Sequence, residues 1–150
     1  MSFPTITGKN LEDKKLTIPN ELEGEFNFLI IAFQRWHQQL VDTWTPFLKD
    51  ITEQNQNSKF YELPTISSKF KDQRPYIDRG MRAGIRSREI RERTITLYLD
   101  KEDLKKHLEV QSEETIFTFL IDRSGKIYWR GIGQYKPEYK LQLDRILNFN

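Results

Sequence analysis

The sequence predicts an α/β fold in which a central mixed sheet is flanked by helices. Three observations favour this fold class. The run Phe26–Phe33 (FNFLIIAF) is apolar along nearly its whole length, which is typical of a strand that is covered on both faces. Strand-like and helix-like patterns then alternate along the chain, as they do when a sheet has parallel strands. A hairpin pattern and a last helix follow, so we expect one side of the sheet to be antiparallel.

The strand at Phe26–Phe33 is followed by a helix and a second strand. Apolar residues recur at steps of three and four between about Gln38 and Glu53, which predicts an amphipathic helix that packs on the sheet. Phe60–Ile66 (FYELPTI) is the second strand candidate. Pro64 has no N–H to donate to a neighbouring strand, so we expect this strand to end there or to lie at an edge.

The middle of the chain combines a polar segment with another strand and helix. Lys69–Arg93 contains Gly80 and Gly84, each of which weakens a helix by about 1 kcal/mol relative to alanine. We therefore expect a weak helix in this segment. Thr94–Leu99 (TITLYL) is rich in β-branched and aromatic residues and is a strand candidate, and Asp100–Leu108 has a short helical pattern.

The last third of the chain predicts a hairpin and a final helix. Two strand candidates, Thr115–Ile121 and Lys126–Gly131, are joined by the turn Arg123–Gly125, whose glycine suits a turn that needs a positive φ. Pro137 opens the last helix, and its inner face would carry Tyr139, Leu143, Ile146 and Leu147. The chain has no internal repeat and no long linker, so we expect residues 1–150 to form a single domain.

The composition limits the chemistry that the chain can perform. The 150 residues include no cysteine, so the chain has no thiolate nucleophile, no disulfide and no cysteine-bound zinc. Thiol oxidoreductase and thiol peroxidase activity are therefore excluded. The two histidines lie far apart and the glycines match no phosphate-binding motif, so the sequence predicts no metal and no cofactor.

The charge and the apolar runs bear on the location of the protein. A formal net charge of +2 is too small to indicate a nucleic-acid or membrane partner by itself. The longest strongly apolar run, Phe28–Phe33, is far shorter than the roughly 20 residues that span a bilayer. The opening MSFPTITGKN lacks the pattern of a signal peptide, so the protein is either cytosolic or already processed, and the first alternative is favoured. We therefore expect a cytoplasmic protein, either free or at the periphery of a membrane.

Several of these features together resemble the thioredoxin-like fold. These features are the strand that ends at Phe33, Pro46 in the following helix and the hairpin TFLIDRSGKI. The opening FPTITGKNLEDKKLTI also resembles the N-terminal hairpin of the peroxiredoxin and thiol-reductase branches of this fold. In active relatives two cysteines follow the first of these strands, where this chain has Gln34–Gln39 (QRWHQQ). In the same relatives a cis-proline precedes the strand that corresponds to the one ending here at Asp122. Its place falls near Ile116, so this chain has neither the cysteines nor that proline.

A more specific resemblance covers about half of the chain. Arg79–Leu99 (RGMRAGIRSREIRERTITLYL) and the later FTFLIDRSGKIYWRGIG resemble the mitochondrial ATPase-complex assembly factors, which are thioredoxin-like proteins associated with assembly of the membrane sector of ATP synthase. The chain lacks an Arg- and Ser-rich transit leader, which suggests a bacterial or otherwise non-mitochondrial relative. The resemblance implies a protein partner, such as a membrane-sector subunit of ATP synthase.

The most strongly biased stretch is Arg74–Arg93. It contains seven of the eleven arginines, three acidic residues and no lysine. On one continuous helix, four arginines would lie within about 60° of one another, and we call them the arginine stripe: Arg79, Arg82, Arg86 and Arg93. Such a stripe would bind carboxylates, phosphates or acidic lipid head groups. The alternative is a solvated face whose arginines pair with nearby acids. Tyr76 is the one aromatic residue in the stretch, so nucleic acid is not favoured as a partner.

Two functional hypotheses follow, and neither includes a catalytic residue. In the first, the protein binds another protein through the arginine stripe and four further side chains. The candidate binding residues are Arg35, Trp36, His37, Arg79, Arg82, Arg86, Arg93 and Trp129. Core packing is the alternative for the tryptophans, and an exposed loop or helix-start position is the alternative for the histidine. In the second, the protein is a small-anion-binding protein or an enzyme, which requires His37, Arg82 and Arg86 to converge.

Overall fold

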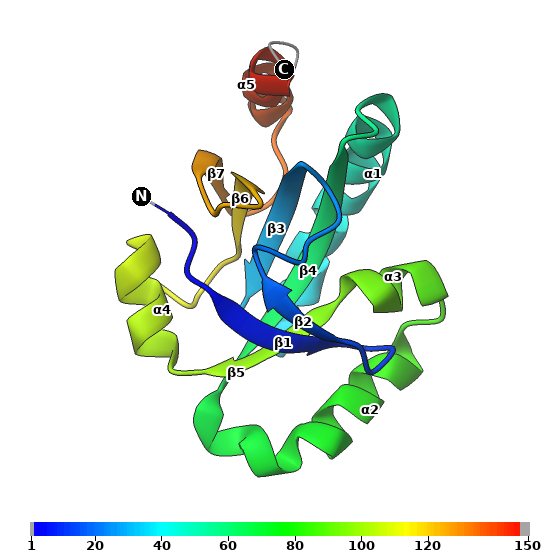
Figure 1. Ribbon diagram of the computed structural model, residues 1–150, viewed down its shortest axis with the longest axis vertical. Helices are drawn as coiled ribbons and strands as arrows, with labels where there is room; N and C mark the ends of the chain where they lie inside the picture. Colours follow the sequence, from blue (N-terminus) through cyan, green and yellow to red (C-terminus); the bar gives the residue numbers. More distant parts are fainter. Residues whose placement is uncertain (1, 148–150) are drawn as a thin grey trace.

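The computed structural model describes residues 2–147 and contains a seven-stranded mixed sheet with helices on both faces (Figure 1). The strand order is β2-β1-β5-β4-β3-β6-β7. Strands β3, β4 and β5 run parallel, and the strands on either side of these three pair in the antiparallel sense. The predicted mixed sheet is therefore confirmed. The strands are β1 (Ile6–Asn10), β2 (Lys15–Ile18), β3 (Phe26–Ala32), β4 (Ser58–Ser67), β5 (Ile95–Leu99), β6 (Phe117–Asp122) and β7 (Ile127–Ile132).

The helices divide between the two faces of the sheet. On one face, Trp44 of α1 and Leu143 of α5 join a core that includes Phe28 of β3. On the other face, Leu104 of α4 packs in a second core with Leu29 of β3. Within residues 2–147, no helix is both long enough and apolar enough to cross a bilayer. The helices are η1 (Arg35–His37), α1 (Gln38–Gln54), η2 (Ser68–Gln73), α2 (Arg74–Gly84), α3 (Arg88–Arg93), α4 (Lys101–Leu108) and α5 (Pro137–Leu147).

Strand β4 continues through Pro64, so the expectation that the strand would end there or lie at an edge is wrong. Its ladder with β3 ends at the pair Ala32↔Pro64, and its ladder with β5 starts at the pair Thr65↔Leu97. An isolated bridge, Glu62↔Thr94, lies in the same register on the β5 side, so the pairing on this side is interrupted at Pro64, which has no N–H to donate.

Both predicted hairpins are present. Strands β1 and β2 pair from Ile6↔Ile18 to Lys9↔Lys15, and β1 also pairs with β5, so the N-terminal hairpin extends the sheet. Strands β6 and β7 form the late hairpin, and Gly125 in its turn has a φ of 93°. The helix α5 begins at Pro137 as expected.

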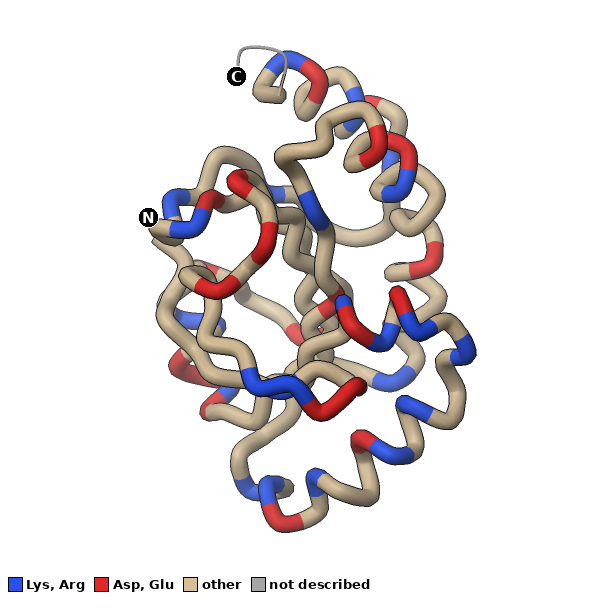
Figure 2. The backbone as a smooth tube through the Cα atoms, turned by 45° about the vertical axis from the view of Figure 1, so that its right-hand side comes forward, with Lys and Arg blue, Asp and Glu red and all other residues tan. Residues whose placement is uncertain are grey.

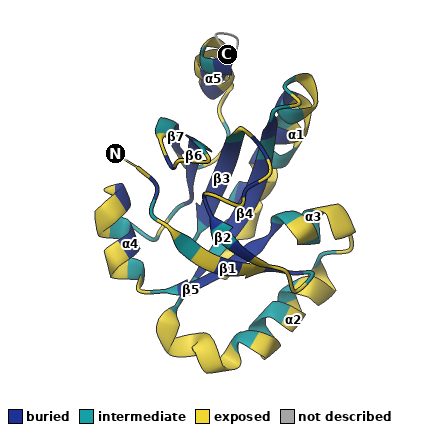
Figure 3. Ribbon diagram, viewed as in Figure 1, coloured by how far each residue is buried: buried dark blue, intermediate teal, exposed yellow. Residues whose placement is uncertain are grey.

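The segment 69–93 is helical as expected, but it is divided into η2, α2 and α3, so the arginine stripe as a single helical face is wrong. Helix α2 ends at Gly84, and Ile85 takes an extended conformation with φ −115° and ψ 106°. A new helix, α3, starts after Ser87, whose side chain accepts a hydrogen bond from the Ile90 N–H at 3.3 Å. The break separates Arg93 from the axis of α2. Neither η2 nor α2 contains a buried residue, and Figure 3 shows both along the exposed rim of the molecule.

Candidate functional site

The residues after β3 lie where the resemblance places the cysteines of active relatives. His37 is fully buried there, and its Nδ1 accepts hydrogen bonds from the backbone N–H groups of Phe33 at 3.0 Å and Gln34 at 3.2 Å. An accepting ring nitrogen carries no proton, so the ring is neutral and its proton is on Nε2. Burial lowers the pKa of His37, and the carbonyl and charge of Glu114 offset only part of this effect. The alternative of an exposed loop or helix-start histidine is therefore wrong about exposure and right about position, because His37 is fully buried and is the N-cap residue of α1.

Arg35 and Trp36 form a small exposed surface next to the buried His37. Trp36 is 48% exposed, and its ring contacts the His37 ring edge-on at 4.5 Å. Arg35 is exposed, and it forms no ion pair with the residues that the structure describes. Gln34 donates from Nε2 to the carbonyl of Glu113 at 3.4 Å, which links this surface to the loop before β6. Two consecutive exposed residues, an arginine and a tryptophan, can thus contact a partner.

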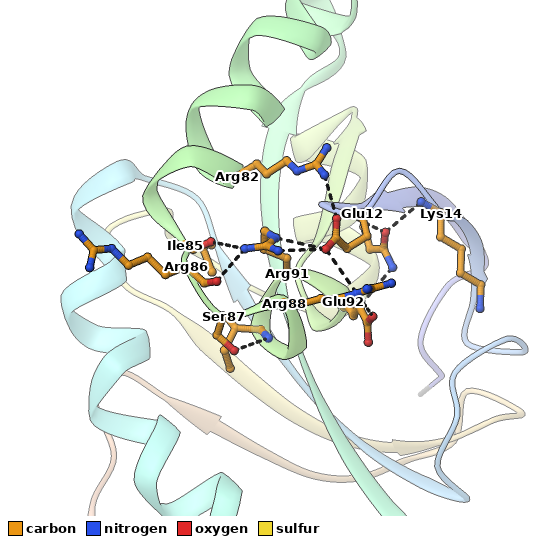
Figure 4. Close-up of polar contacts among 11 residues, drawn as sticks. Glu12, Lys14, Arg82, Ile85, Arg86, Ser87, Arg88, Arg91 and Glu92 are labelled. Atoms are coloured by element: carbon orange, nitrogen blue, oxygen red, sulfur yellow. Dashed lines mark hydrogen bonds and ion pairs between the residues drawn. The ribbon is translucent and has the colours of Figure 1, made fainter.

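Glu12, in the turn between β1 and β2, binds three arginines of α2 and α3 (Figure 4). Its Oε2 lies 3.1 Å from Nη2 of Arg82, and its Oε1 lies 3.1 Å from Nη2 of Arg91 and 3.7 Å from Nε of Arg88. The Glu12 side chain is only 17% exposed, so solvent screens these contacts less than it screens a surface ion pair. The N-terminal hairpin and the stretch Arg74–Arg93, which we call the arginine-rich segment, are therefore joined by one carboxylate.

Arg91 also connects the two helices across their break. Its Nη1 donates to the backbone carbonyls of Ile85 at 2.9 Å and Arg86 at 2.8 Å, while its Nε and Nη2 donate to Glu12. Carbonyl groups at the end of a helix have no partner within that helix, and the Arg91 guanidinium supplies one. Arg91 is thus engaged within the molecule and does not offer its donors to a ligand.

Arg74 anchors the start of α2 to β5. Its Nε lies 3.3 Å from Oδ2 of Asp78, its Nη2 donates to the carbonyl of Thr96 at 3.0 Å, and its guanidinium lies 4.6 Å from the centre of the Tyr98 ring. The Tyr98 hydroxyl donates to Oδ1 of Asp78 at 2.7 Å. Burial of Tyr98, together with this bond to a carboxylate, raises the pKa of its hydroxyl. Ionic and polar contacts therefore hold α2 against β5.

Arg79 and Arg86 are left facing the solvent. Both are exposed, and no ion pair within residues 2–147 includes either of them. Figure 4 shows the Arg86 side chain pointing away from Glu12. Arg93, by contrast, pairs with Glu89 at 2.9 Å. The arginine-rich segment is thus partly a set of internal ion pairs and partly a surface that can contact a partner.

Trp129 is a core residue. Its Nε1 donates to Oε1 of Gln142 at 2.7 Å, and its ring meets those of Trp44 at 5.9 Å and Tyr139 at 5.0 Å. These contacts bury it between β7, α1 and α5. The core-packing alternative holds for Trp129, whereas Trp36 is exposed.

The residues required for the small-anion hypothesis do not come together. His37 binds the backbone after β3, Arg82 binds Glu12 in the β1–β2 turn, and Arg86 is exposed beyond the end of α2. Among the hydrogen bonds and ion pairs of residues 2–147, none joins His37 to either arginine. The geometry therefore gives this hypothesis no support.

The family model described as ATP10 protein matches residues 1–148. The chain belongs to the ATP10 protein family. The family match points to assembly of ATP synthase, and it confirms the resemblance that the second half of the sequence carries. No curated protein matches the sequence.

Solved structures similar to this ATP10 family member are thioredoxin-like. The exposed lipoprotein thioredoxin Etrx1 of Streptococcus pneumoniae strain TIGR4 is 15% identical, with 96% of this chain and 100% of that chain covered and a TM-score of 0.61. StoA of Bacillus subtilis is 16% identical, with 93% and 96% covered and a TM-score of 0.58. A thiol-disulfide oxidoreductase of Bacteroides fragilis is 14% identical, with 98% and 100% covered and a TM-score of 0.57. At these identities the likeness confirms the fold and carries no function with it.

The ATP10 family member also contains a buried carboxyl group that the sequence reasoning missed. Glu62 of β4 is buried beside the start of α1, and its Oε1 lies 3.5 Å from Nε2 of Gln38. Burial raises the pKa of Glu62, the Gln38 hydrogen bond opposes this, and the charge of Asp42 raises the pKa further. The acidic residue inside the otherwise apolar FYELP could have indicated this group, because an ionisable side chain is rarely buried in a central strand unless it is paired or functional.

Proposed function

We propose that the protein is an assembly factor for ATP synthase that binds a protein subunit of the membrane sector and performs no thiol chemistry. Membership of the ATP10 family, through the match to residues 1–148, is the observation that carries the proposal. The absence of cysteine from this chain and the buried, neutral His37 at the place of the thiols support a role by binding alone.

Two exposed surfaces support a protein partner. One consists of Arg35 and Trp36 next to the buried His37, and the other includes the exposed Arg86 beyond the end of α2. Tryptophan and arginine are the residue types that most often dominate the binding energy of protein interfaces. Unpaired guanidinium groups favour a partner that presents carboxylates at the point of contact.

The proposed partner indicates where in the cell the protein would act. A factor that receives membrane-sector subunits works where those subunits enter the bilayer, so we place the protein on the cytoplasmic side, peripheral to the membrane that holds ATP synthase. Contact with a membrane-complex subunit then requires no membrane span of its own.

The test is deletion of the gene followed by complementation. Loss of the gene is expected to lower the amount of assembled ATP synthase on native gels, and the wild-type chain restores it. A chain with Arg35→Ala and Trp36→Ala is expected to restore less and to recover less membrane-sector subunit in a pull-down. The matched control carries Lys106→Ala and Leu141→Ala, which remove an exposed basic and an exposed apolar side chain from α4 and α5. Unchanged assembly after deletion, or no ATP synthase subunit in the pull-down, would contradict the proposal.

A further inference from the structure

The segment Ser68–Gly84, which comprises η2 and α2, lies on the molecule without contributing to either core. It contains no buried residue. Its attachments are polar: Arg74 binds Asp78 and the Thr96 carbonyl, and Arg82 binds Glu12. Figure 1 shows α2 along the outer rim, away from α1 and α5. The outward side of this segment is therefore open to solvent.

The outward side of the segment is basic. Ser68–Gly84 contains five basic and two acidic residues, but Arg74 and Arg82 bind Asp78 and Glu12. Within residues 2–147, the exposed charges of the segment outside any ion pair are Lys69, Lys71, Arg79 and Asp72, so three basic residues stand against one acidic residue; Figure 2 shows both kinds of position along this edge. Asp78 is directed inward, where Tyr98 donates to it at 2.7 Å, so it does not neutralise the outer side. Lys69, Lys71 and Arg79 are exposed, and within residues 2–147 no acidic side chain pairs with them.

Two aromatic side chains are exposed in the same segment. Phe70 is 37% exposed and Tyr76 is 75% exposed, and the ammonium of Lys69 lies 5.3 Å from the centre of the Phe70 ring. A side-chain carbon added at Gly80 would meet nothing within 4 Å, so α2 is open to solvent at this position too. Aromatic rings next to unpaired cations are the side chains that settle at the head-group level of a bilayer.

We propose that the outward side of Ser68–Gly84 binds the surface of a bilayer that contains anionic phospholipids. Lys69, Lys71 and Arg79 would contact lipid phosphates and carboxylates, and Phe70 and Tyr76 would enter the interface. Lysines among the unpaired cations fit a diffuse anionic surface, which needs charge and not the forked geometry of a single carboxylate. The inference deepens the proposed function and rests on it only for the membrane setting, because it names the surface that holds the factor at the bilayer.

The test is sedimentation of the purified protein with lipid vesicles. We expect it to sediment with vesicles of phosphatidylcholine that contain about one third phosphatidylserine, and not with phosphatidylcholine alone. Raising the salt concentration should release it, because the attraction is screened. The triple variant Lys69→Gln, Lys71→Gln and Arg79→Gln should bind about 100-fold more weakly, since each basic residue near an anionic surface contributes roughly fivefold.

A matched variant and a second pair of substitutions make the test specific. Lys15→Gln, Lys49→Gln and Lys106→Gln remove the same charge from exposed positions on β2, α1 and α4, and this variant should bind anionic vesicles within about twofold of the wild type. Phe70→Ser with Tyr76→Ser should weaken binding while the salt dependence persists. Circular dichroism and urea unfolding are expected to be unchanged in all three, because the replaced side chains are exposed.

Three results would overturn the inference. They are failure of the wild type to sediment with anionic vesicles, equal binding to neutral and anionic vesicles, and equal loss in the triple variant and its matched control. If the vesicles fail while a crosslinker at position 79 captures an acidic protein, the face is a protein-binding surface. Failure of the vesicle test leaves the complementation and pull-down results intact, so the two proposals can be rejected separately.

Discussion

Arg91 binds Glu12 across 79 residues of sequence, with its Nη2 3.1 Å and its Nε 3.3 Å from the same carboxylate oxygen. The pair joins α3 to the β1–β2 turn. The remaining nitrogen of the Arg91 guanidinium, Nη1, donates to the backbone carbonyls of Ile85 and Arg86, which follow the end of α2. One acidic residue of the N-terminal hairpin therefore binds both helices of the arginine-rich segment, while Arg74 anchors the start of α2 to β5.

Replacement of that carboxylate should destabilise the protein. Glu12→Gln is expected to lower the free energy of unfolding by about 2 kcal/mol, because Arg91 is largely shielded and loses a charged acceptor. Urea unfolding measures the change. The control Glu92→Gln removes an exposed partner of Arg88 and should cost less than about 1 kcal/mol. Equal losses in the two variants would show that the Glu12 cluster is only a surface feature.

His37 should be more important for stability than for chemistry. His37→Ala removes the acceptor of two backbone N–H groups, one of them buried, and is expected to cost about 2 kcal/mol in urea unfolding. His37→Asn places an amide oxygen near the position of Nδ1 and should recover part of the loss. If asparagine and alanine are equally destabilising, the hydrogen bonds to Nδ1 contribute little.

The lowered pKa of His37 makes the stability depend on pH. In the unfolded chain the ring takes up a proton near its ordinary pKa of 6.5, and in the folded protein it does so only at lower pH. Below about pH 6.5 the unfolded state therefore binds more protons, so the free energy of unfolding should fall as the pH decreases. The difference between the wild type and His37→Asn isolates this effect, and parallel pH profiles of the two proteins would refute it.

Glu62 should act in the opposite direction. Its raised pKa means that the folded protein holds the proton where the unfolded chain has lost it, so this residue lowers stability as the pH rises above the ordinary range of a carboxyl group. Glu62→Gln is expected to raise the free energy of unfolding by on the order of 1 kcal/mol at about pH 7, with a smaller gain at about pH 4. The exposed Glu53→Gln serves as the control and should be neutral at both values. A loss of stability in Glu62→Gln at neutral pH would mean that the carboxylate is held charged.

Two glycines should respond to alanine with opposite signs. A side-chain carbon at Gly131 of β7 would overlap the Trp129 ring, so Gly131→Ala is expected to cost about 2 kcal/mol. Gly80 lies within α2 and has open space around it, so Gly80→Ala should stabilise by about 1 kcal/mol through helix propensity. Thermal unfolding of the two variants measures both, and a destabilised Gly80→Ala would indicate that α2 needs the glycine.

The sheet could be predicted from the sequence because its signals are local. The apolar run that became β3, the stepwise pattern that became α1 and the glycine turn at Gly125 each depend on residues close together in the chain. Pro64 misled the prediction because its meaning depends on which neighbour β4 has at that point, which is a property of the sheet and not of the strand.

The candidate site was harder to predict because its partners are distant in sequence. Helical periodicity gave the arginines one common face, but Ser87 caps a new helix and Arg91 turns to Glu12. The Gly84 and Ser87 pair was the local signal for the break. No local pattern could show that Trp129 would be enclosed by α5, or that His37 would turn its Nδ1 back onto the strand end.

The lack of buried residues in α2 has a consequence for how the molecule opens. Its contacts with the rest of the chain include ion pairs, hydrogen bonds and the contact of Arg74 with the Tyr98 ring, and no residue of α2 belongs to either core, so we expect α2 to detach while both cores stay packed. Regions of this kind form the first cooperative unit to unfold, at a free energy well below that of the whole protein. Amide protons of α2 should accordingly exchange with deuterium long before those of β3, and a ligand that binds the helix would slow them selectively.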